Sequence, residues 1–229
     1  MQIIRQLFDI NTSTYTYIIA SGYGREGIII DPVSANTSSY INLLNELNLK
    51  LVMCVDTHTH ADHVSSRCQL CTQTKCLSVM GEQTKAECIS VYAKDGESIP
   101  FDGMKILPIY TPGHTDDSYS YLIDNNVFTG DTLFVRGTGR TDFQKGNPSA
   151  LYDSITEKLF SLPESTIVYP GHDYNGNTVS SIYEEIRYNP RVANKSKVEF
   201  IDIMNSLNLK KPAMIDKVVP ANLSCTCGL

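Results

Sequence analysis

Three of the five histidines in the chain fall within one six-residue window, His58-Thr59-His60-Ala61-Asp62-His63. In an extended chain, residues two positions apart point to the same side, so His58 and His60 can face one site. Asp62 and His63 can turn back toward that site, although Asp62 could instead cap a following helix. Imidazole and carboxylate groups together suit zinc, iron or manganese. Because adjacent histidines repel each other when protonated and add little to an apolar core, the window predicts a metal site.

The other two histidines and one aspartate lie in similar settings, each directly after a glycine at the end of a predicted strand. They are His114 in Pro112-Gly113-His114, Asp131 in Thr129-Gly130-Asp131, and His172 in Pro170-Gly171-His172. The glycine lets the backbone bend so that the next side chain can aim inward. Taken alone, each histidine could be a hydrogen-bonded polar residue and Asp131 a turn former. Together with the window, they predict a ligand set at strand ends, where crevices open in α/β folds.

The pattern of apolar residues places these side chains on a mixed α/β frame. Strands are predicted over 1–8, 13–20, 26–31, 49–55, 76–80 and 166–169, with a hairpin over 98–110 that turns at Asp102-Gly103 and two strands within 118–134. Helices are predicted over 38–47, 148–162, 178–188 and 197–207. We found no repeat and no linker, so the chain is predicted to be one domain over residues 1–229, of the α/β class.

Composition narrows the class of protein. The 229 residues carry a net charge of −6, which argues against a nucleic-acid binder. No apolar run approaches the ~20 residues that span a bilayer, and the first residues do not resemble a signal peptide. Seven cysteines, an odd number, are unlike a secreted disulfide framework. These features predict a cytoplasmic protein with no membrane or nucleic-acid partner.

The HxHxDH window followed by Gly-His, Gly-Asp and Gly-His resembles the metallo-β-lactamase superfamily over roughly residues 2–191. That resemblance implies an αββα four-layer sandwich with the metal site at one edge, between two sheets. In dinuclear members, one metal takes the positions of His58, His60 and His114, the other takes those of Asp62, His63 and His172, and Asp131 bridges them.

Within the superfamily, the local sequence is similar to the persulfide dioxygenases, the family of the ethylmalonic encephalopathy protein. Ala61 is small, as in that family, whereas glyoxalase II enzymes often have an aromatic residue there. Three further segments match the family: Asp131-Thr132-Leu133-Phe134-Val135-Arg136-Gly137-Thr138-Gly139-Arg140-Thr141-Asp142-Phe143-Gln144, Tyr169-Pro170-Gly171-His172-Asp173-Tyr174 and Val219-Pro220-Ala221-Asn222-Leu223. The stretch after the HxHADH window departs from the family, which usually has a glycine there.

The resemblance implies a specific chemistry. One Fe(II) per chain would be bound by His58, His114 and Asp131, a facial triad that leaves positions for substrate and oxygen. The substrates would be glutathione persulfide and O2, and the products would be sulfite and glutathione after hydrolysis of the oxidised persulfide. Four residues would orient the ligands and hold waters around the iron, although they could also bind a second metal: His60, Asp62, His63 and His172.

Two residues are candidates for handling the substrate. Glutathione has two carboxylates, and Arg140 could bind one of them through paired hydrogen bonds, unless it only forms a structural salt bridge with Asp142. Tyr174 could donate a hydrogen bond near the reacting sulfur or oxygen as a catalytic residue, unless it is a buried structural tyrosine.

Several alternatives stay open from the sequence. A glyoxalase II-type thioester hydrolase with a dinuclear centre is the main one, although that branch usually adds a helical C-terminal region and only about forty residues follow Arg191 here. A metal- or sulfur-binding module without enzyme activity is another. Any rhodanese-type sulfurtransferase partner would be a separate protein, and a homodimer is expected from family habit. The cysteines could form a redox pair or a zinc site, or could simply be reduced and packed in the domain: Cys68, Cys71, Cys76, Cys225 and Cys227.

Overall fold

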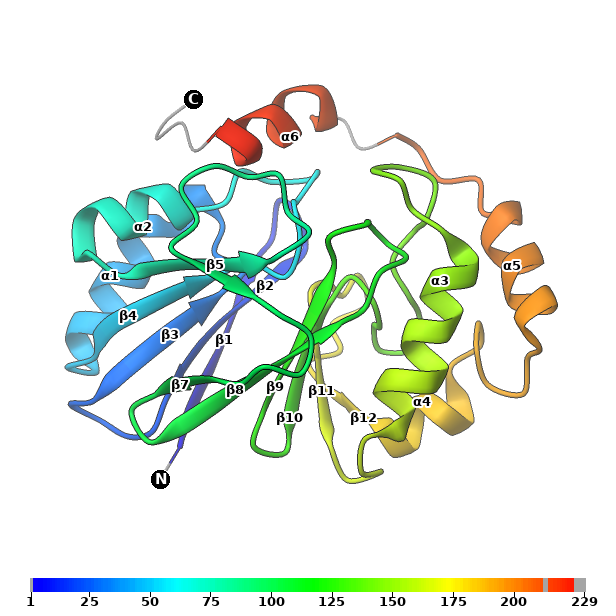
Figure 1. The fold of residues 1–229 in the computed structure, drawn as a ribbon, viewed down its shortest axis with the longest axis horizontal. Helices are drawn as coiled ribbons and strands as arrows, with labels where there is room; N and C mark the ends of the chain where they lie inside the picture. Colours follow the sequence, from blue (N-terminus) through cyan, green and yellow to red (C-terminus); the bar gives the residue numbers. More distant parts are fainter. Residues whose placement is uncertain (1, 212–213, 225–229) are drawn as a thin grey trace.

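The computed structural model describes residues 2–211 and 214–224. The strands form two six-stranded sheets, in the orders β1-β2-β3-β4-β5-β6 and β12-β11-β10-β9-β8-β7 (Figure 1). The strands of the first sheet are β1 (Ile3–Asp9), β2 (Thr14–Ala20), β3 (Glu26–Ile30), β4 (Lys50–Val55), β5 (Leu77–Gly81) and β6 (Val91–Ala93). Those of the second are β7 (Ile99–Phe101), β8 (Met104–Tyr110), β9 (Tyr119–Ile123), β10 (Asn126–Gly130), β11 (Ile167–Pro170) and β12 (Ser180–Ser181).

Both sheets are mixed. In the first, β1 and β3 pair antiparallel with β2, whereas β3, β4, β5 and β6 run parallel. In the second, only β10 and β11 are parallel. The parallel strands need crossover segments, and helices supply two of them: α1 (Thr37–Glu46) between β3 and β4, and α2 (Arg67–Thr74) between β4 and β5.

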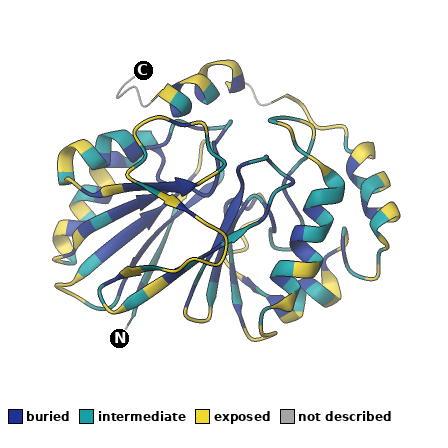
Figure 2. Ribbon diagram, in the orientation of Figure 1, coloured by how far each residue is buried: buried dark blue, intermediate teal, exposed yellow. Residues whose placement is uncertain are grey.

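The main core lies between the two sheets. Alternate residues of the apolar strands point to opposite faces, so Ile28 and Ile30 enter this core while Ile29 faces the other way. Strands buried on both faces read as continuous apolar runs, which explains Ile28-Ile29-Ile30. Aromatic side chains from the second sheet, including Tyr121 and Phe128, close the core from the opposite side. Figure 2 shows the buried strands at the centre and exposed positions on the outer helices.

Helices cover the outer faces of the sandwich. Against the first sheet, Tyr40 and Leu44 of α1 and Leu70 of α2 pack on Ile29 and Cys54. Against the second lie α3 (Pro148–Asp153) with its continuation in a π turn and a 3-10 turn to Ser161, α4 (Ile182–Tyr188) and α5 (Lys197–Ser206). A short 3-10 turn, Ser34–Asn36, precedes α1, and α6 (Ile215–Ser224) lies at the top of Figure 1. The expectation of four αββα layers is confirmed.

The predicted elements are largely present, with shifts of a few residues at their ends. Four elements were not expected: α2, α6, β6 and β12. The helix expected from 178 begins at Ile182 instead, because Ser180–Ser181 pairs with β11 and Ser181 caps α4 by accepting a hydrogen bond from the amide of Glu184. No helix within the described ranges is long and apolar enough to cross a membrane.

Four strands bring the predicted ligands to one edge of the sandwich. The histidine window follows β4, and His114 follows β8 after a short loop. Asp131 comes directly after β10, and residue 172 lies two positions beyond β11. Because β10 and β11 are neighbouring parallel strands, their carboxyl ends place Asp131 and His172 side by side. The topology therefore assembles a site from segments that are up to 114 residues apart, from His58 to His172.

Candidate metal centre

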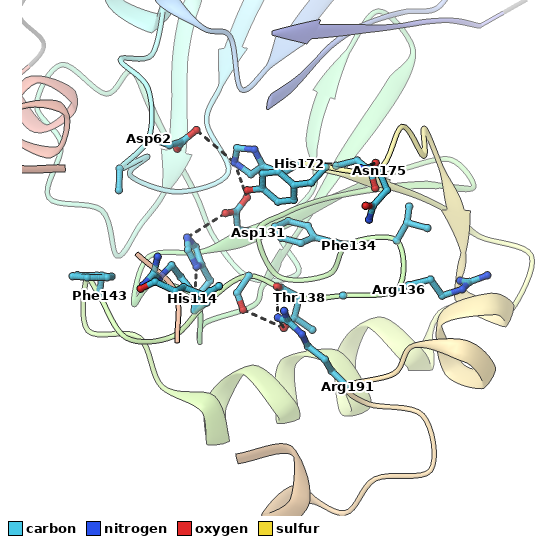
Figure 3. Close-up of a pocket in the computed structure, with 18 of the residues that line it drawn as sticks. Asp62, His114, Asp131, Phe134, Arg136, Thr138, Phe143, His172, Asn175 and Arg191 are labelled. Atoms are coloured by element: carbon cyan, nitrogen blue, oxygen red, sulfur yellow. Dashed lines mark hydrogen bonds and ion pairs between the residues drawn. The ribbon is translucent and has the colours of Figure 1, made fainter. Parts of the chain in front are cut away.

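Six of the seven metal-facing residues predicted from the sequence fall into two clusters of candidate ligand atoms. In the first, one ligand atom each from His58, His114 and Asp131 lies within 4.8 Å of the others. In the second, the same holds for His60, Asp62 and His63. The seventh residue, His172, also contacts Asp131. Nε2 of His114 is 3.4 Å from Oδ2 of Asp131, and Nε2 of His172 is 3.5 Å from Oδ1 of the same carboxylate. Figure 3 shows Asp131 between His114 and His172.

Hydrogen bonds fix the orientation of two of these imidazoles. Nδ1 of His114 donates to the carbonyl oxygen of Arg140 at 2.7 Å, and Nδ1 of His172 donates to the carbonyl oxygen of Ser13 at 3.0 Å. A carbonyl oxygen only accepts, so Nδ1 carries the proton in both rings. The neutral form of each ring then has its lone pair on Nε2, the atom that faces Asp131. This is the usual arrangement of a histidine that binds a metal.

His58 is oriented through a short relay. The Thr57 hydroxyl lies 2.9 Å from Nδ1 of His58 and 2.8 Å from Oδ2 of Asp31. The hydroxyl donates its proton to the carboxylate and accepts from Nδ1, which leaves Nε2 of His58 with a lone pair. Burial lowers the pKa of His58 well below its usual value, and neighbouring His60 and His114 lower it further. His58 is therefore a neutral imidazole that is ready to bind a cation.

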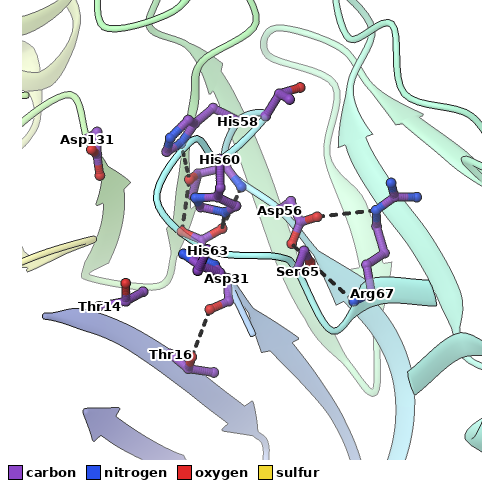
Figure 4. A network of polar contacts seen from close by, with 12 residues as sticks. Thr14, Thr16, Asp31, Asp56, His58, His60, His63, Ser65, Arg67 and Asp131 are labelled. Carbon is purple, nitrogen blue, oxygen red and sulfur yellow. Dashed lines mark hydrogen bonds and ion pairs between the residues drawn. The ribbon is translucent and has the colours of Figure 1, made fainter. Parts of the chain in front are cut away.

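His60 has a different environment, because its Nε2 lies 3.1 Å from Oδ1 of Asp31 (Figure 4). Burial alone would lower the pKa of His60, but the charge of Asp31 and its hydrogen bond outweigh burial and raise the pKa to about 10. Without a metal, His60 and Asp31 thus form a buried ion pair. Asp31 also accepts a hydrogen bond from the amide of Thr57, so one carboxylate contacts both Thr57 and His60 in the loop that follows β4.

The donor atoms fit a metal ion. Among the described residues, Oδ1 of Asp131, Nδ1 of His60 and Nε2 of His63 are buried without a hydrogen-bond partner. Buried polar atoms are normally paired, so atoms left unpaired at one place are the kind that a bound cation would satisfy. Burial would raise the pKa of Asp62, but His63 and His172 lower it well below its usual value, so this carboxylate is charged. Nitrogen and carboxylate donors of this kind suit iron or zinc.

Two glycines at the strand ends are required by geometry. Gly113, before His114, has φ +141°, and a Cβ there would lie 2.3 Å from Cα of Leu151. Gly130, before Asp131, has φ +48°, and a Cβ there would lie 2.4 Å from Oγ1 of Thr57. Any side chain at either position would push a ligand-bearing turn away from its neighbour. This supports the inference that glycine lets these side chains turn inward.

A cavity of about 520 Å³ opens next to the candidate ligands. Asp62, His114, Asp131 and His172 form part of its lining, with Phe134 and Phe143 as apolar walls (Figure 3). Four positively charged side chains also line it: Arg136, Arg140, Arg191 and Lys210. The volume is typical of small-molecule sites, which are roughly 300–1,000 Å³. The cavity therefore offers room and positive charge for an anionic ligand beside the candidate metal position.

Arg140 lines this cavity and is also held by the protein. Its Nε and Nη2 pair with the carboxylate of Asp142, both at 2.6 Å, and Nη1 donates to the carbonyl oxygen of Lys210 at 2.7 Å. The salt bridge with Asp142 that we considered from the sequence is therefore present. Its guanidinium lies over the ring of Phe143, 4.7 Å from the centroid.

Tyr174 is 70% exposed and lines the cavity, so it is not a buried structural tyrosine. Its ring stacks on the imidazole of His172, with centroids 5.9 Å apart. Partial burial of the phenol and the charges of Asp131 and Asp62 raise its pKa, so the hydroxyl keeps its proton and can donate.

Sequence reasoning missed several residues that hold the window. Asp31 follows β3 just as the ligands follow their strands, and this shared position at a strand end was the available signal. Asp117 accepts from the amide and hydroxyl of Thr59, at 3.2 and 2.6 Å. Asn222 bonds to the backbone of the window from α6. No local pattern around Asp117 or Asn222 indicates these contacts, because each partner is distant in sequence.

None of the cysteines in the described part of the chain lines this cavity. Sγ of Cys71 and Sγ of Cys76 are 3.5 Å apart, both as thiols. Cys68 is disulfide-bonded, so the alternative of a reduced, packed cysteine does not hold at that position. Cys225 and Cys227 lie outside the described residues. Within the described part of the chain, no cysteine belongs to a cluster of three or more candidate metal ligands, so the alternative of a zinc site there has no support.

Comparison with known proteins identifies the family. A model of the metallo-beta-lactamase superfamily matches residues 89–172. The human protein named persulfide dioxygenase ETHE1, mitochondrial, is 40% identical over 226 residues, which cover 97% of this chain and 88% of the human protein. The chain belongs to the persulfide dioxygenase family.

The solved structures agree with this assignment. The crystal structure of ETHE1 from Myxococcus xanthus matches this chain with a TM-score of 0.95 and 50% sequence identity. The match covers 97% of this chain and 99% of the Myxococcus chain. A hydroxyacylglutathione hydrolase of Dictyostelium discoideum is more distant, with 30% identity over 72% of this chain and 64% of its own length. The resemblance inferred from the motifs is confirmed, and so is the metallo-β-lactamase fold.

The pair of His60 and Asp31 predicts how stability depends on pH in the metal-free protein. The pKa of His60 is about 10 in the folded chain and 6.5 in its ordinary state. The pair therefore stabilises the fold fully below pH 6.5, and this contribution is lost as the pH rises toward 10. We expect the free energy of unfolding, measured with urea across this range, to fall with rising pH, and to fall much less in Asp31→Asn.

Asp102→Asn is a matched control for this prediction. Both aspartates have a left-handed backbone, with φ 50° at Asp31 and 45° at Asp102, which asparagine tolerates. Arg25 lowers the pKa of Asp102, so its titration lies in the acid range, outside the window tested. A parent and an Asp31→Asn variant with the same pH dependence would contradict the proposed pair.

Proposed function

We propose that this protein is an iron-dependent persulfide dioxygenase: O2 adds both of its oxygen atoms to the outer sulfur of glutathione persulfide, and water then cleaves the S–S bond of the oxidised product to give sulfite and glutathione. One Fe(II) per chain would be held by His58, His114 and Asp131. The observation that carries the proposal is the cluster of these three ligands beside a cation-lined cavity, in a chain that belongs to the persulfide dioxygenase family. Two histidines and one carboxylate are the facial triad of non-haem Fe(II) oxygenases.

The protein's contribution is to hold its ligands ready. Bound Fe(II) would supply open positions and electrons that allow O2 to react with a persulfide sulfur. The carbonyl oxygen of Arg140 holds the Nδ1 proton of His114, and Thr57 holds that of His58, so both rings face the metal position without rearrangement. The rings of Phe134 and Phe143 exclude water from the cavity wall. Holding the two reactants together in this space makes their reaction effectively intramolecular.

The lining of the cavity suits a small anionic thiol derivative. Glutathione carries two carboxylates, and the cavity presents guanidinium and ammonium groups on its lining. We assign Arg140 to substrate binding, where a substrate carboxylate would share or replace its contacts with Asp142. Arg191 donates from Nη1 to the carbonyl oxygen of Thr138 at 2.7 Å and offers a second cation on the same lining.

Tyr174 is assigned as the catalytic hydrogen-bond donor. Partial burial of the phenol, together with the charges of Asp131 and Asp62, raises the pKa of Tyr174, so its hydroxyl keeps its proton. Its ring lies on His172, so the side chain is placed over the side of the centre where Asp131 and His172 meet. A neutral phenol there can donate to the developing charge on sulfur or oxygen without itself being consumed.

Four further residues would orient the ligands and hold water near the iron: His60, Asp62, His63 and His172. His60 forms an ion pair with Asp31, and His63 contacts the carboxylate of Asp62 at 3.0 Å.

The runner-up function is a glyoxalase II-type thioester hydrolase with two metals, where a bridging hydroxide would attack the carbonyl. The unpartnered atoms of His60 and His63 are the observation that favours it. A separate rhodanese-type sulfurtransferase, a homodimer and a cytoplasmic location remain predictions.

Oxygen uptake tests the proposed reaction directly. Fe(II)-loaded protein given anaerobically prepared glutathione persulfide should consume about one O2 per persulfide, because both oxygen atoms end on one sulfur. His114→Ala should lose at least ~100-fold in rate, because it removes a metal ligand. Protein that retains iron but takes up no oxygen, and instead hydrolyses a glutathione thioester, would establish the runner-up.

Metal content separates one iron from two. We expect close to one iron per chain after anaerobic loading and removal of loose metal, measured by elemental analysis. His63→Ala should retain that iron, whereas His58→Ala should lose most of it, since His58 belongs to the proposed triad and His63 does not. Two tightly held irons per chain in the parent, with one lost in His63→Ala, would show a dinuclear centre.

Arg140 is tested by comparing it with its salt-bridge partner. Arg140→Lys keeps the charge but loses the paired geometry, so KM for glutathione persulfide should rise about tenfold with kcat little changed. Asp142→Asn breaks the same salt bridge but leaves the guanidinium free, so its KM should stay near that of the parent. Equal rises in KM for both variants would mean that Arg140 acts only through Asp142.

A further inference from the structure

Asn222, on α6, is buried against the loop that carries the histidine window. Its side chain is 8% exposed. Nδ2 donates to the carbonyl oxygens of His60 and His63, at 3.0 and 2.9 Å, and Oδ1 accepts from the amide of Ser65 at 2.9 Å. One side-chain amide thus uses both of its N–H groups and its oxygen on a six-residue stretch of backbone.

These bonds replace secondary structure that the loop lacks. Residues 56–64 belong to no helix or strand, so their carbonyl groups have no regular backbone ladder. Buried carbonyl oxygens need donors from elsewhere in the molecule. Asn222 supplies them across 162 positions of sequence to His60. The amide therefore fixes the path of the backbone at the two residues that flank Ala61 and Asp62.

A second buried side chain holds Asn222 in place. Nη2 of Arg67, at the start of α2, donates to the main-chain oxygen of Asn222 at 3.1 Å. The same guanidinium pairs through Nε with Asp56 at 3.2 Å (Figure 4), and through Nη1 it donates to the carbonyl oxygen of Glu87. The amide of Glu87 in turn donates to the carbonyl oxygen of Leu223 at 2.7 Å. Arg67 is 2% exposed, so this pair is shielded from water.

The two ends of the loop are therefore both hydrogen-bonded to the buried pair of Arg67 and Asn222. Asp56 lies two residues before His58, and its carboxylate also accepts from the Ser65 hydroxyl at 2.9 Å. Asn222 holds the carbonyl groups of His60 and His63 and the amide of Ser65. Neither Asn222 nor Arg67 lines the large cavity, so neither can touch the substrate there. Their contacts act on the backbone that carries the metal-facing side chains.

We propose that Asn222 is a positioning residue for the metal centre. By holding the carbonyl groups of His60 and His63, it fixes the backbone of the histidine window and so the orientation of the side chains that face the metal. The inference rests on the proposed function only in taking His58, His114 and Asp131 as metal ligands. Loss of the amide donors lets the loop relax, which weakens metal retention and distorts the ligand geometry. Residues that orient metal ligands from behind typically contribute 10–100-fold to metal affinity or activity.

The test compares Asn222→Asp with Val218→Ala, each as a single change in the otherwise unaltered protein. Asn222→Asp keeps the shape but replaces both N–H groups with a carboxylate that faces two carbonyl oxygens. Val218 is buried on the same helix, 4% exposed, and has no hydrogen bond to the loop, so Val218→Ala loosens the packing of α6 alone. Each protein is loaded with Co(II), whose visible absorption reports ligand geometry, and the rate of metal loss to a chelator is measured.

We expect Asn222→Asp to lose Co(II) about tenfold faster than the parent and to show altered visible bands. Val218→Ala should lower the urea midpoint while keeping the parent's spectrum and rate. Asn222→Ala, which removes the donors without adding charge, serves if the aspartate variant does not fold. An unchanged spectrum and rate in a folded Asn222 variant, or equal effects in Val218→Ala, would overturn the proposal.

Activity gives a further, separable readout. In oxygen-uptake assays, Asn222→Asp should lower kcat more than it raises KM, because the substrate cavity keeps its lining. If the parent shows no dioxygenase activity but Asn222→Asp still releases Co(II) faster, the proposed function fails and the positioning role stands. If the parent is active and both metal readouts are unchanged, the positioning role fails alone.

Discussion

A histidine that binds a metal needs one ring nitrogen held by a hydrogen bond so that the other can face the metal, and the fold supplies this hydrogen bond for three of the histidines. The Nδ1 protons of His114 and His172 are held by carbonyl oxygens from distant loops, and that of His58 by a threonine anchored on Asp31. Each bond requires another segment to be in place. Thus the centre depends on correct packing of the whole edge of the sandwich, and not on the ligand-bearing loops alone.

The two sheets make that packing possible because they deliver strand ends to a shared edge. Parallel pairing of β10 with β11 sets Asp131 beside His172, and the same edge receives the window from β4 in the other sheet. Glycines 113 and 130 allow turns that no side chain would permit. The cavity with its four cationic side chains then lies over the candidate ligands as a consequence of the loops that follow these strands. Residues for substrate binding and for metal binding therefore share one framework.

Much of this arrangement follows from sequence, for identifiable reasons. Ile28-Ile29-Ile30 indicates a strand buried on both faces, and the ligands are marked by glycine and strand ends. The helix α2 was missed because, of its eight residues, only Arg67 and Leu70 are buried, and α6 because Pro220 lies inside it. Asp31 and Asp117 were not singled out, and Asn222 was noted only as part of a segment that matches the family. Their role is to satisfy the backbone of segments far away, and no local pattern encodes such contacts.

The contact of Asn222 with His60 also has a consequence for folding during synthesis, because the two residues are far apart in the chain. During synthesis the window is made 162 residues before the amide that holds it. At about 5–20 residues per second, the ribosome takes roughly 8–30 s to cover that distance. Throughout this interval the nascent chain exposes three histidines and an aspartate on a loop whose backbone is not yet secured. The backbone of the window therefore gains these two hydrogen bonds only after α6 has been made and has docked.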